Sequence, residues 1–271
     1  MALFTQLQTS FGQLVNNTSV DSIERNFWLN EGYKKFVIAH DWPWAITIYG
    51  TPLVAYRANY PLPSDWRKWR WLKQDGVAIE EIPVELLIGG TAGYSILEDD
   101  SNLLINPVPT AASESDTTDN AESAGSAVVV EMSDTGNIAA GDFIYIEGIS
   151  GGATVKEIAS VSAVSANVSI TISRLKHSYN AGAIVFEITE GLLGEYWYIP
   201  ADMVGASDTN IVPDRWDMSI AKYAASMYYR KLEEHSLADR WLREFNTDIA
   251  LCWKEQQLRS AKGRVEFAVK K

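Results

Sequence analysis

Apolar residues recur with a helical period near the start of the chain. One face of a short amphipathic helix is formed by Leu7, Phe11, Leu14 and Val15. The polar run at 16–18 ends this helix. Asp21, followed by Glu24 three positions later, predicts a capping box and the start of a longer helix. Its apolar positions cover more than a third of its circumference, so we expect neighbours on two sides.

A turn rich in aromatic residues follows this helix. Pro43 disfavours helical geometry at the preceding Trp42, and Trp44 lies on the other side of the turn, so we expect the two indoles to close the end of a core. Residues 45–56 then have the pattern of an extended segment, and the prolines within 59–66 predict a rigid connection.

The run WRKWRW at 66–71 interleaves basic and aromatic residues. Grooves that bind single-stranded nucleic acid have this composition, but in a strand such alternation separates indoles and cations onto opposite faces. We interpret the run as a half-buried strand, with a protein–protein interface as the next alternative. Short strand pairs are predicted to follow through 93–94 and 103–105.

The middle of the chain has a different amino-acid composition. Residues 107–126 are rich in Ser, Thr, Ala and Asp and predict a linker. Five apolar runs then predict the strands of a small β-barrel or sandwich: 128–130, 143–146, 161–164, 168–172 and 184–186. A glycine-rich turn at 148–152 predicts a hairpin within it.

Helical periodicity returns after Trp197 and Pro213. One predicted helix carries an apolar face at 220–228, and a second repeats an apolar residue every four positions from Leu237 to Trp253 and runs to about residue 261. The alternating tail beyond Gly263 predicts a strand without a partner.

These patterns predict an α+β protein with a helical bundle core, a small β-sheet region and an inserted all-β domain. We expect an N-terminal part of the helical core at 1–106, the linker at 107–126, the inserted β domain at 127–190, the C-terminal part of the core at 191–262 and a docking tail at 263–271. The following residues are expected to pack in the core: Phe27, Trp42, Trp44, Trp66, Tyr228, Trp241 and Phe245.

Composition narrows the function classes. The net charge of −12 argues against a dedicated DNA-binding domain, and residues 107–190 contribute −8 of it. No apolar run reaches the roughly 20 residues that span a bilayer, and the first residues lack a signal-peptide layout, so we expect a cytoplasm-like location and no membrane partner. The single cysteine, Cys252, excludes an internal disulfide.

The sequence offers few candidates for catalytic or metal-binding residues. His40, His177 and His235 have no second ligand at metal spacing, and no nucleophile elbow or phosphate-binding loop occurs. The adjacent carboxylates at 98–100 and 233–234 are interpreted as solvated turns. We therefore expect no catalytic residue, no cofactor and no metal, and hence no enzyme.

Four motifs carry a family resemblance: AHDWPW at 39–44, YPLPSDW at 60–66, YAASMYYRK at 223–231 and ADRW at 238–241. They resemble the head-to-tail connector, or adaptor, proteins of tailed bacteriophages, most closely those of short-tailed phages. The resemblance covers about 1–106 and 191–271; the simplest members lack the β insert. It implies a structural virion protein in the neck, assembled in the host cytoplasm, as a ring of about twelve copies.

That resemblance also implies partners. The ring would bind the portal above and tail nozzle or tail-tube proteins below, and double-stranded DNA would pass through its channel during genome ejection without sequence-specific binding. Residues 254–271 hold six basic and two acidic groups. The portal-docking residues are expected there: Arg259, Lys262, Arg264, Val265, Phe267, Val269, Lys270 and Lys271. A disordered tail is the alternative.

Two other functions stay open from sequence. A virion glycan hydrolase would need paired carboxylates across a cleft. A tail or baseplate protein would bind host-surface carbohydrate through the aromatic residues of the β insert: Phe143, Tyr145, Tyr179 and Phe186.

Overall fold

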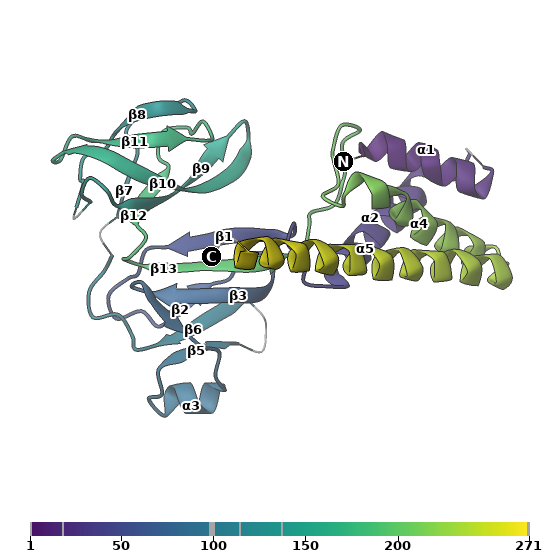
Figure 1. Cartoon of the computed structure of the whole chain (residues 1–271), viewed down its shortest axis with the longest axis horizontal. Coiled ribbons are helices and arrows are strands. Elements are labelled where there is room, and N and C mark those ends of the chain that lie inside the picture. Colours follow the sequence, from purple (N-terminus) through teal and green to yellow (C-terminus); the bar gives the residue numbers. More distant parts are fainter. Residues whose placement is uncertain (1, 18, 98–100, 114, 137, 270–271) are drawn as a thin grey trace. The chain divides into compact units, whose positions relative to one another are not determined.

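The structure is a computed structural model that describes residues 2–17, 19–97, 101–113, 115–136 and 138–269, with side chains as far as Arg259. The chain divides into two compact units (Figure 1). We call Met1–Ile46 with Trp197–Lys271 the helical unit, and Thr47–Tyr196 the β unit.

Strands outnumber helices among the described residues. Thirteen strands form three sheets there, against five α-helices and one short 3-10 helix. The expectation of an α+β protein with a helical bundle core is therefore wrong. Strands β1 (Ile46–Thr51), β3 (Trp66–Gln74) and β13 (Leu192–Tyr198), from segments that we assigned to the helical core, join in one sheet. Their aromatic and β-branched residues suit a half-buried strand.

The helical unit contains α1 (Phe4–Val15), α2 (Ser22–Ile38), the 3-10 turn η1 (Asp214–Trp216), α4 (Asp217–Lys231) and α5 (His235–Val269). The start of α2 is as predicted: Asp21 Oδ1 accepts hydrogen bonds from the N–H groups of Ile23 (2.8 Å) and Glu24 (3.2 Å). The Glu24 carboxylate binds Lys231 Nζ at 2.5 Å, which ties α2 to α4.

The core of the helical unit comes from all four helices and the loops at 39–46 and 199–216, with no residue of the β unit. On α2 the core face is formed by Trp28, Leu29, Tyr33, Phe36 and Val37. Spacings of three, four and seven keep these side chains on one side of the helix.

The first part of the β unit contains two small sheets. One has the strand order β1-β13-β3-β4, with β4 at Val77–Ile79. The other has the order β2-β6-β5, from Asn59–Pro61, Asn102–Asn106 and Gly93–Ile96. Tyr94 pairs with Ile105, which confirms the predicted strand pair. A short helix, α3 (Val84–Ile88), precedes β5.

A six-stranded sheet in the order β7-β12-β9-β10-β11-β8 makes up the rest of the β unit. Its strands are β7 (Ser115–Thr117), β8 (Gly125–Glu131), β9 (Phe143–Ser150), β10 (Ala153–Ser165), β11 (Ser169–Leu175) and β12 (Ile184–Glu187). All five predicted strands are present. The sheet curls: beyond β7, the Asp119 N–H donates to the Glu131 carbonyl on β8 at 2.8 Å.

Two local expectations in this sheet have opposite outcomes. Gly151 and Gly152 have φ angles of 57° and 88° between β9 and β10, so the glycine-rich turn is the predicted hairpin. The segment 107–126, expected to be a linker, contains β7, which pairs with β12. Backbone pairing needs no large apolar side chain, so composition alone missed this strand.

A small apolar cluster joins the six-stranded sheet to the first sheet within the β unit. Tyr145, Phe186 and Leu193 are buried together, with Ile48 and Trp71 packed against them. A Cβ atom added at Gly50 would lie 2.9 Å from the Tyr145 ring. Contact between the sheets is therefore close.

The C-terminal tail differs from its prediction. The backbone from 263 to 269 is helical as the end of α5, instead of an unpaired strand. Extending a helix adds one hydrogen bond per residue, whereas a lone strand leaves its backbone groups unpaired. Lys270 and Lys271 and the side chains of Lys262, Arg264, Val265, Phe267 and Val269 lie outside the described residues.

Candidate docking surfaces

The predicted core residues lie in different environments. Trp42 is fully buried and donates its indole N–H to the Phe36 carbonyl at 3.0 Å. Its ring stacks on Phe36 (5.6 Å between centroids) and Trp44 (5.2 Å). Phe245 is also buried, with its ring 5.2 Å from Tyr223. These contacts join the end of α2 to the C-terminal helices.

The other predicted core residues lie nearer the surface. Tyr228 and Trp241 are half-buried against the helical core. Trp66 is half-buried in the β unit, with its ring 6.2 Å from that of Trp69. Phe27 is 59% exposed, so its assignment to the core is wrong. It lies on α2 one position before Trp28, about 100° away from the buried face.

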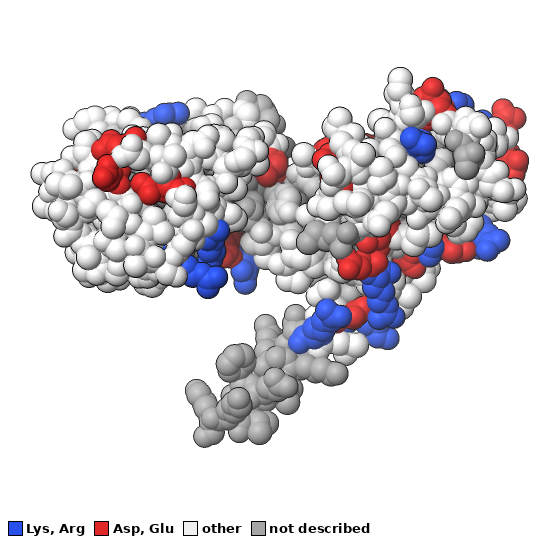
Figure 2. Space-filling view, turned by 90° about the horizontal axis from the view of Figure 1, so that it is seen from above, with Lys and Arg blue, Asp and Glu red and all other residues white. Residues whose placement is uncertain are grey.

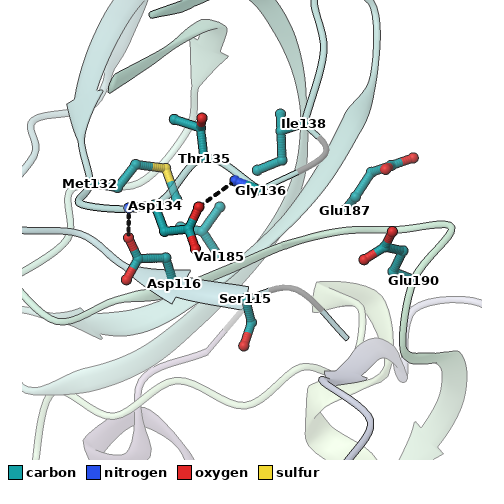
Figure 3. A pocket seen from close by; sticks show the side chains of 10 residues that line it. All are labelled: Ser115, Asp116, Met132, Asp134, Thr135, Gly136, Ile138, Val185, Glu187 and Glu190. Atoms are coloured by element: carbon teal, nitrogen blue, oxygen red, sulfur yellow. Dashed lines mark hydrogen bonds between the residues drawn. The ribbon is translucent and has the colours of Figure 1, made fainter. Parts of the chain in front are cut away.

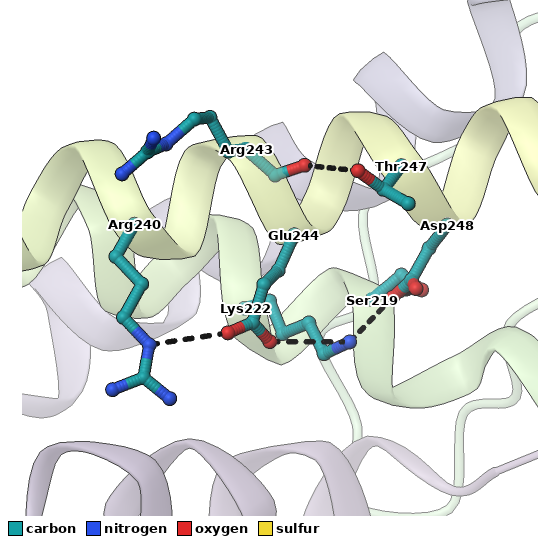
Figure 4. A network of polar contacts seen from close by, with 7 residues as sticks. All are labelled: Ser219, Lys222, Arg240, Arg243, Glu244, Thr247 and Asp248. Atoms are coloured by element: carbon teal, nitrogen blue, oxygen red, sulfur yellow. Dashed lines mark hydrogen bonds and ion pairs between the residues drawn. The ribbon is translucent and has the colours of Figure 1, made fainter.

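A polar network connects α4 to α5 (Figure 4). Lys222 Nζ lies 2.7 Å from Asp248 Oδ2 and 3.6 Å from Glu244 Oε2. Ser219 donates its hydroxyl to the same Asp248 oxygen at 2.6 Å, and Arg240 binds Glu244 at 3.2 Å. The Lys222 and Asp248 side chains are only 20% and 16% exposed, so this ion pair is largely shielded from water. It fixes α5 against α4.

The distal part of α5 extends beyond this attachment (Figure 1). Trp253, whose ring stacks on that of His40 with 4.6 Å between centroids, is the last described apolar side chain of α5 that packs on the core, and Glu255 still binds Arg215 of η1 at 3.5 Å. Some 16 residues after Trp253 continue the helix for about 24 Å. Leu258 is 56% exposed, and Arg259 binds Glu255 one turn earlier at 2.6 Å. Lys and Arg side chains lie on the last described turns (Figure 2).

Acidic residues surround a small pocket in the six-stranded sheet (Figure 3). Asp116, Asp134, Glu187 and Glu190 line it. Its volume is about 10 Å³, which is room for one water molecule at most. Asp116 accepts from the Asp134 N–H at 2.6 Å, and Asp134 accepts from the Gly136 N–H at 2.8 Å. These two carboxylates fix the loop, and the pocket is too small for a substrate.

No candidate enzyme site emerges from the described residues. They contain no group of three His, Cys, Asp or Glu residues that could hold a metal ion. Cys252 is buried, and burial raises the pKa of its thiol to about 12, so it is a poor nucleophile. The carboxylates at 98–100, considered from sequence, lie outside the described residues. Among the helices described, none has the length and apolarity to cross a membrane.

The aromatic residues of the β insert are mostly internal. Tyr145, Tyr179 and Phe186 are at most 2% exposed, whereas Phe143 is 52% exposed. The Tyr179 hydroxyl donates to the buried Glu157, which also accepts from the N–H groups of Lys176 and His177. These residues build the core and its loops, so they do not form an exposed platform for a sugar.

Two features that sequence reasoning missed are the α4–α5 network and Arg25. Arg25 lines a groove along α1, and its Nε is buried without a hydrogen-bond partner in the described part of the chain. A sequence shows neither, because both depend on which helix faces meet. The i, i+4 pair of Arg240 and Glu244 was the only available signal for the network.

The described residues thus offer a helix pair joined by an ion-pair network and a polar groove along α1, features that suit contacts with other proteins rather than a catalytic site. The family model described as the SU10 adaptor protein matches residues 3–266. The chain therefore belongs to the SU10 adaptor protein family, and the predicted relation to phage head-to-tail adaptors is confirmed.

Other comparisons add little. The tailspike protein gp49 from Pseudomonas phage LKA1 is 24% identical over 29% of this chain and 15% of that one, with a TM-score of 0.22. A cycloalternan-forming enzyme from Listeria monocytogenes is 12% identical over 53% of this chain and 19% of the enzyme, with a TM-score of 0.17. The chain spans less than a fifth of either protein, and neither similarity carries an argument. No curated protein matches the chain.

Proposed function

We propose that this chain is a structural head-to-tail adaptor that forms a ring beneath the portal of a phage virion and connects the capsid to the tail. Membership of the adaptor family supports this role most directly. The ring, of about twelve copies, surrounds the channel through which DNA leaves the capsid. The chain acts there as a structural part and not as an enzyme.

The distal part of α5 is the portal-docking element of this proposal. Residues 254–271 carry six basic and two acidic groups, on a chain whose net charge is −12. The α4–α5 ion pair holds the base of the helix in place. A rigid helix loses less conformational entropy on binding than a disordered tail, so this attachment favours docking.

The net charge also suits the channel. Acidic side chains gather on one face of the β unit (Figure 2), and residues 107–190 have eleven acidic and three basic groups. Such a surface does not release counterions from DNA phosphates, so DNA can pass without being held.

Binding to purified portal rings tests the docking element. The triple variant Arg259→Glu, Lys262→Glu, Arg264→Glu should no longer co-sediment with portal, because it reverses three charges of the distal helix. The matched control Arg259→Lys, Lys262→Arg, Arg264→Lys keeps the charges and should bind like the wild type. Undiminished binding by the charge-reversed variant would place the docking surface elsewhere.

A carbohydrate-binding tail or baseplate protein was the alternative. Three of the four aromatic residues of the insert are buried, and no described feature favours this function over the adaptor role.

A further inference from the structure

Arg25 on α2 has a buried side-chain nitrogen without a hydrogen-bond partner among the described residues. This atom is Nε, and the side chain as a whole is half-buried. Two other cations of this unit have carboxylate partners: Lys34 lies 2.8 Å from Asp202, and Lys231 lies 2.5 Å from Glu24. A buried Nε–H without a partner costs free energy, which an incoming carboxylate would offset.

The surroundings of Arg25 form a groove of about 670 Å³ along α1. Its lining includes Thr5, Gln8, Thr9, Phe11, Gln13 and Arg25. The α1 sequence, FTQLQTSFGQLV, contains no charged residue, so Arg25 is the charged group of this lining. The groove therefore fits a segment that brings one carboxylate beside uncharged side chains.

The β unit presents such a segment at α3. Leu86 and Ile88 are 52% and 80% exposed, and Val77 on β4 is 68% exposed. Glu85 is an exposed carboxylate next to Leu86. In Figure 1, α3 stands at the end of the β unit away from the six-stranded sheet. Large apolar side chains exposed on so short a segment can be covered by a partner.

We propose that α3 of one copy docks in the α1–α2 groove of the next copy, with the Glu85 carboxylate on the Arg25 guanidinium. This inference rests on the ring of the proposed function. A ring of identical chains joins two different surfaces of the same chain, and each copy here offers both. Docking neutralises Arg25 and covers part of the exposed apolar surface of α3.

Charge exchange tests the pairing in the full chain. Arg25→Glu alone and Glu85→Arg alone should each weaken self-association at least about tenfold in sedimentation velocity, because each places like charges together. The double variant should restore it. An equimolar mixture of the two single variants should also assemble, since every groove then meets a tip of opposite charge. The control Arg174→Glu, an exposed arginine on β11, should assemble like the wild type.

Cysteine pairs locate the contact directly. Gln8→Cys in one preparation and Glu85→Cys in another should form a disulfide-linked dimer when mixed, with or without portal; the native Cys252 is fully buried. Gln8→Cys mixed with Arg174→Cys should not.

The outcomes separate this inference from the proposed function. If wild-type rings form but the 8–85 pair does not link and charge exchange does not rescue, the groove has another occupant and the inference is overturned. Loss of portal binding by Arg25→Glu with unchanged self-association would show that the portal fills the groove, which also overturns it. If the wild type forms no ring even on portal, the proposed function fails as well.

Discussion

The Lys222 ammonium on α4 lies 2.7 Å from the Asp248 carboxylate on α5, with both side chains about four-fifths buried. Lys222→Met would leave Asp248 without its cation in a poorly hydrated place. We expect a loss of about 1–3 kcal/mol in the free energy of unfolding, between the values for exposed and fully buried pairs. Urea unfolding of the full chain measures it.

A matched control is Arg240→Met, which removes the more exposed pair with Glu244 on the same helix. We expect a change below about 0.5 kcal/mol. Equal losses in the two variants would show that shielding of the Lys222 pair contributes nothing.

Trp42 and Trp241, two of the tryptophans of the helical unit, should differ in how much each contributes to stability. Trp42→Ala removes a fully buried ring that stacks on two neighbours, and should cost about 3–5 kcal/mol. Trp241 is half-buried with the Arg240 guanidinium 5.2 Å from its ring centre, so Trp241→Ala should cost about 1–2 kcal/mol. A larger loss for Trp241 than for Trp42, in thermal or urea unfolding, would contradict this ordering.

Removal of residues 112–189 tests whether the inserted segment folds apart from the helices. The helical core contains no residue of the β unit, so helical circular dichroism should persist in the deletion variant. The deletion exposes Leu193, Ile48 and Trp71, so the remaining sheet should lose stability. Loss of the helical signal would contradict the independent helical unit.

Asp217 should make stability depend on pH. Burial raises the pKa of its carboxyl above the usual value, with 8% of the residue exposed. The folded state then binds a proton more tightly than the unfolded state. The stability that this proton contributes is fully present below the pKa of Asp217 in the unfolded chain, and it is lost as pH rises through the pKa in the folded chain. Asp217→Asn does not titrate and should gain stability relative to the wild type from pH 4 to 7. A relative gain that shrinks as pH rises would reverse the sign.

Local patterns predicted individual elements well. The apolar runs at 143–146 and 168–172 became β9 and β11, and the Asp21 cap became the start of α2. Each depends on neighbours in sequence, where turn chemistry and side-chain alternation act directly.

The overall class was not predictable in the same way. Strands β1, β3 and β13 are 46 to 198 residues into the chain and pair across long separations, so no local pattern shows that they share a sheet. Likewise Phe27 and Trp28 are adjacent and both apolar, yet only the packing of α2 against α4 decides which is buried. The missing partner of Arg25 Nε was also not predictable, because only a structure shows which groups lie within hydrogen-bond distance of that atom.

Electron cryo-microscopy of the full chain mixed with portal rings tests the central claim most directly. The adaptor role predicts a closed ring of chain copies on the portal axis, with the distal part of α5 in contact with the portal and an open central channel. Portal particles that carry no additional ring at saturating chain, or that carry single copies away from the axis, would contradict it.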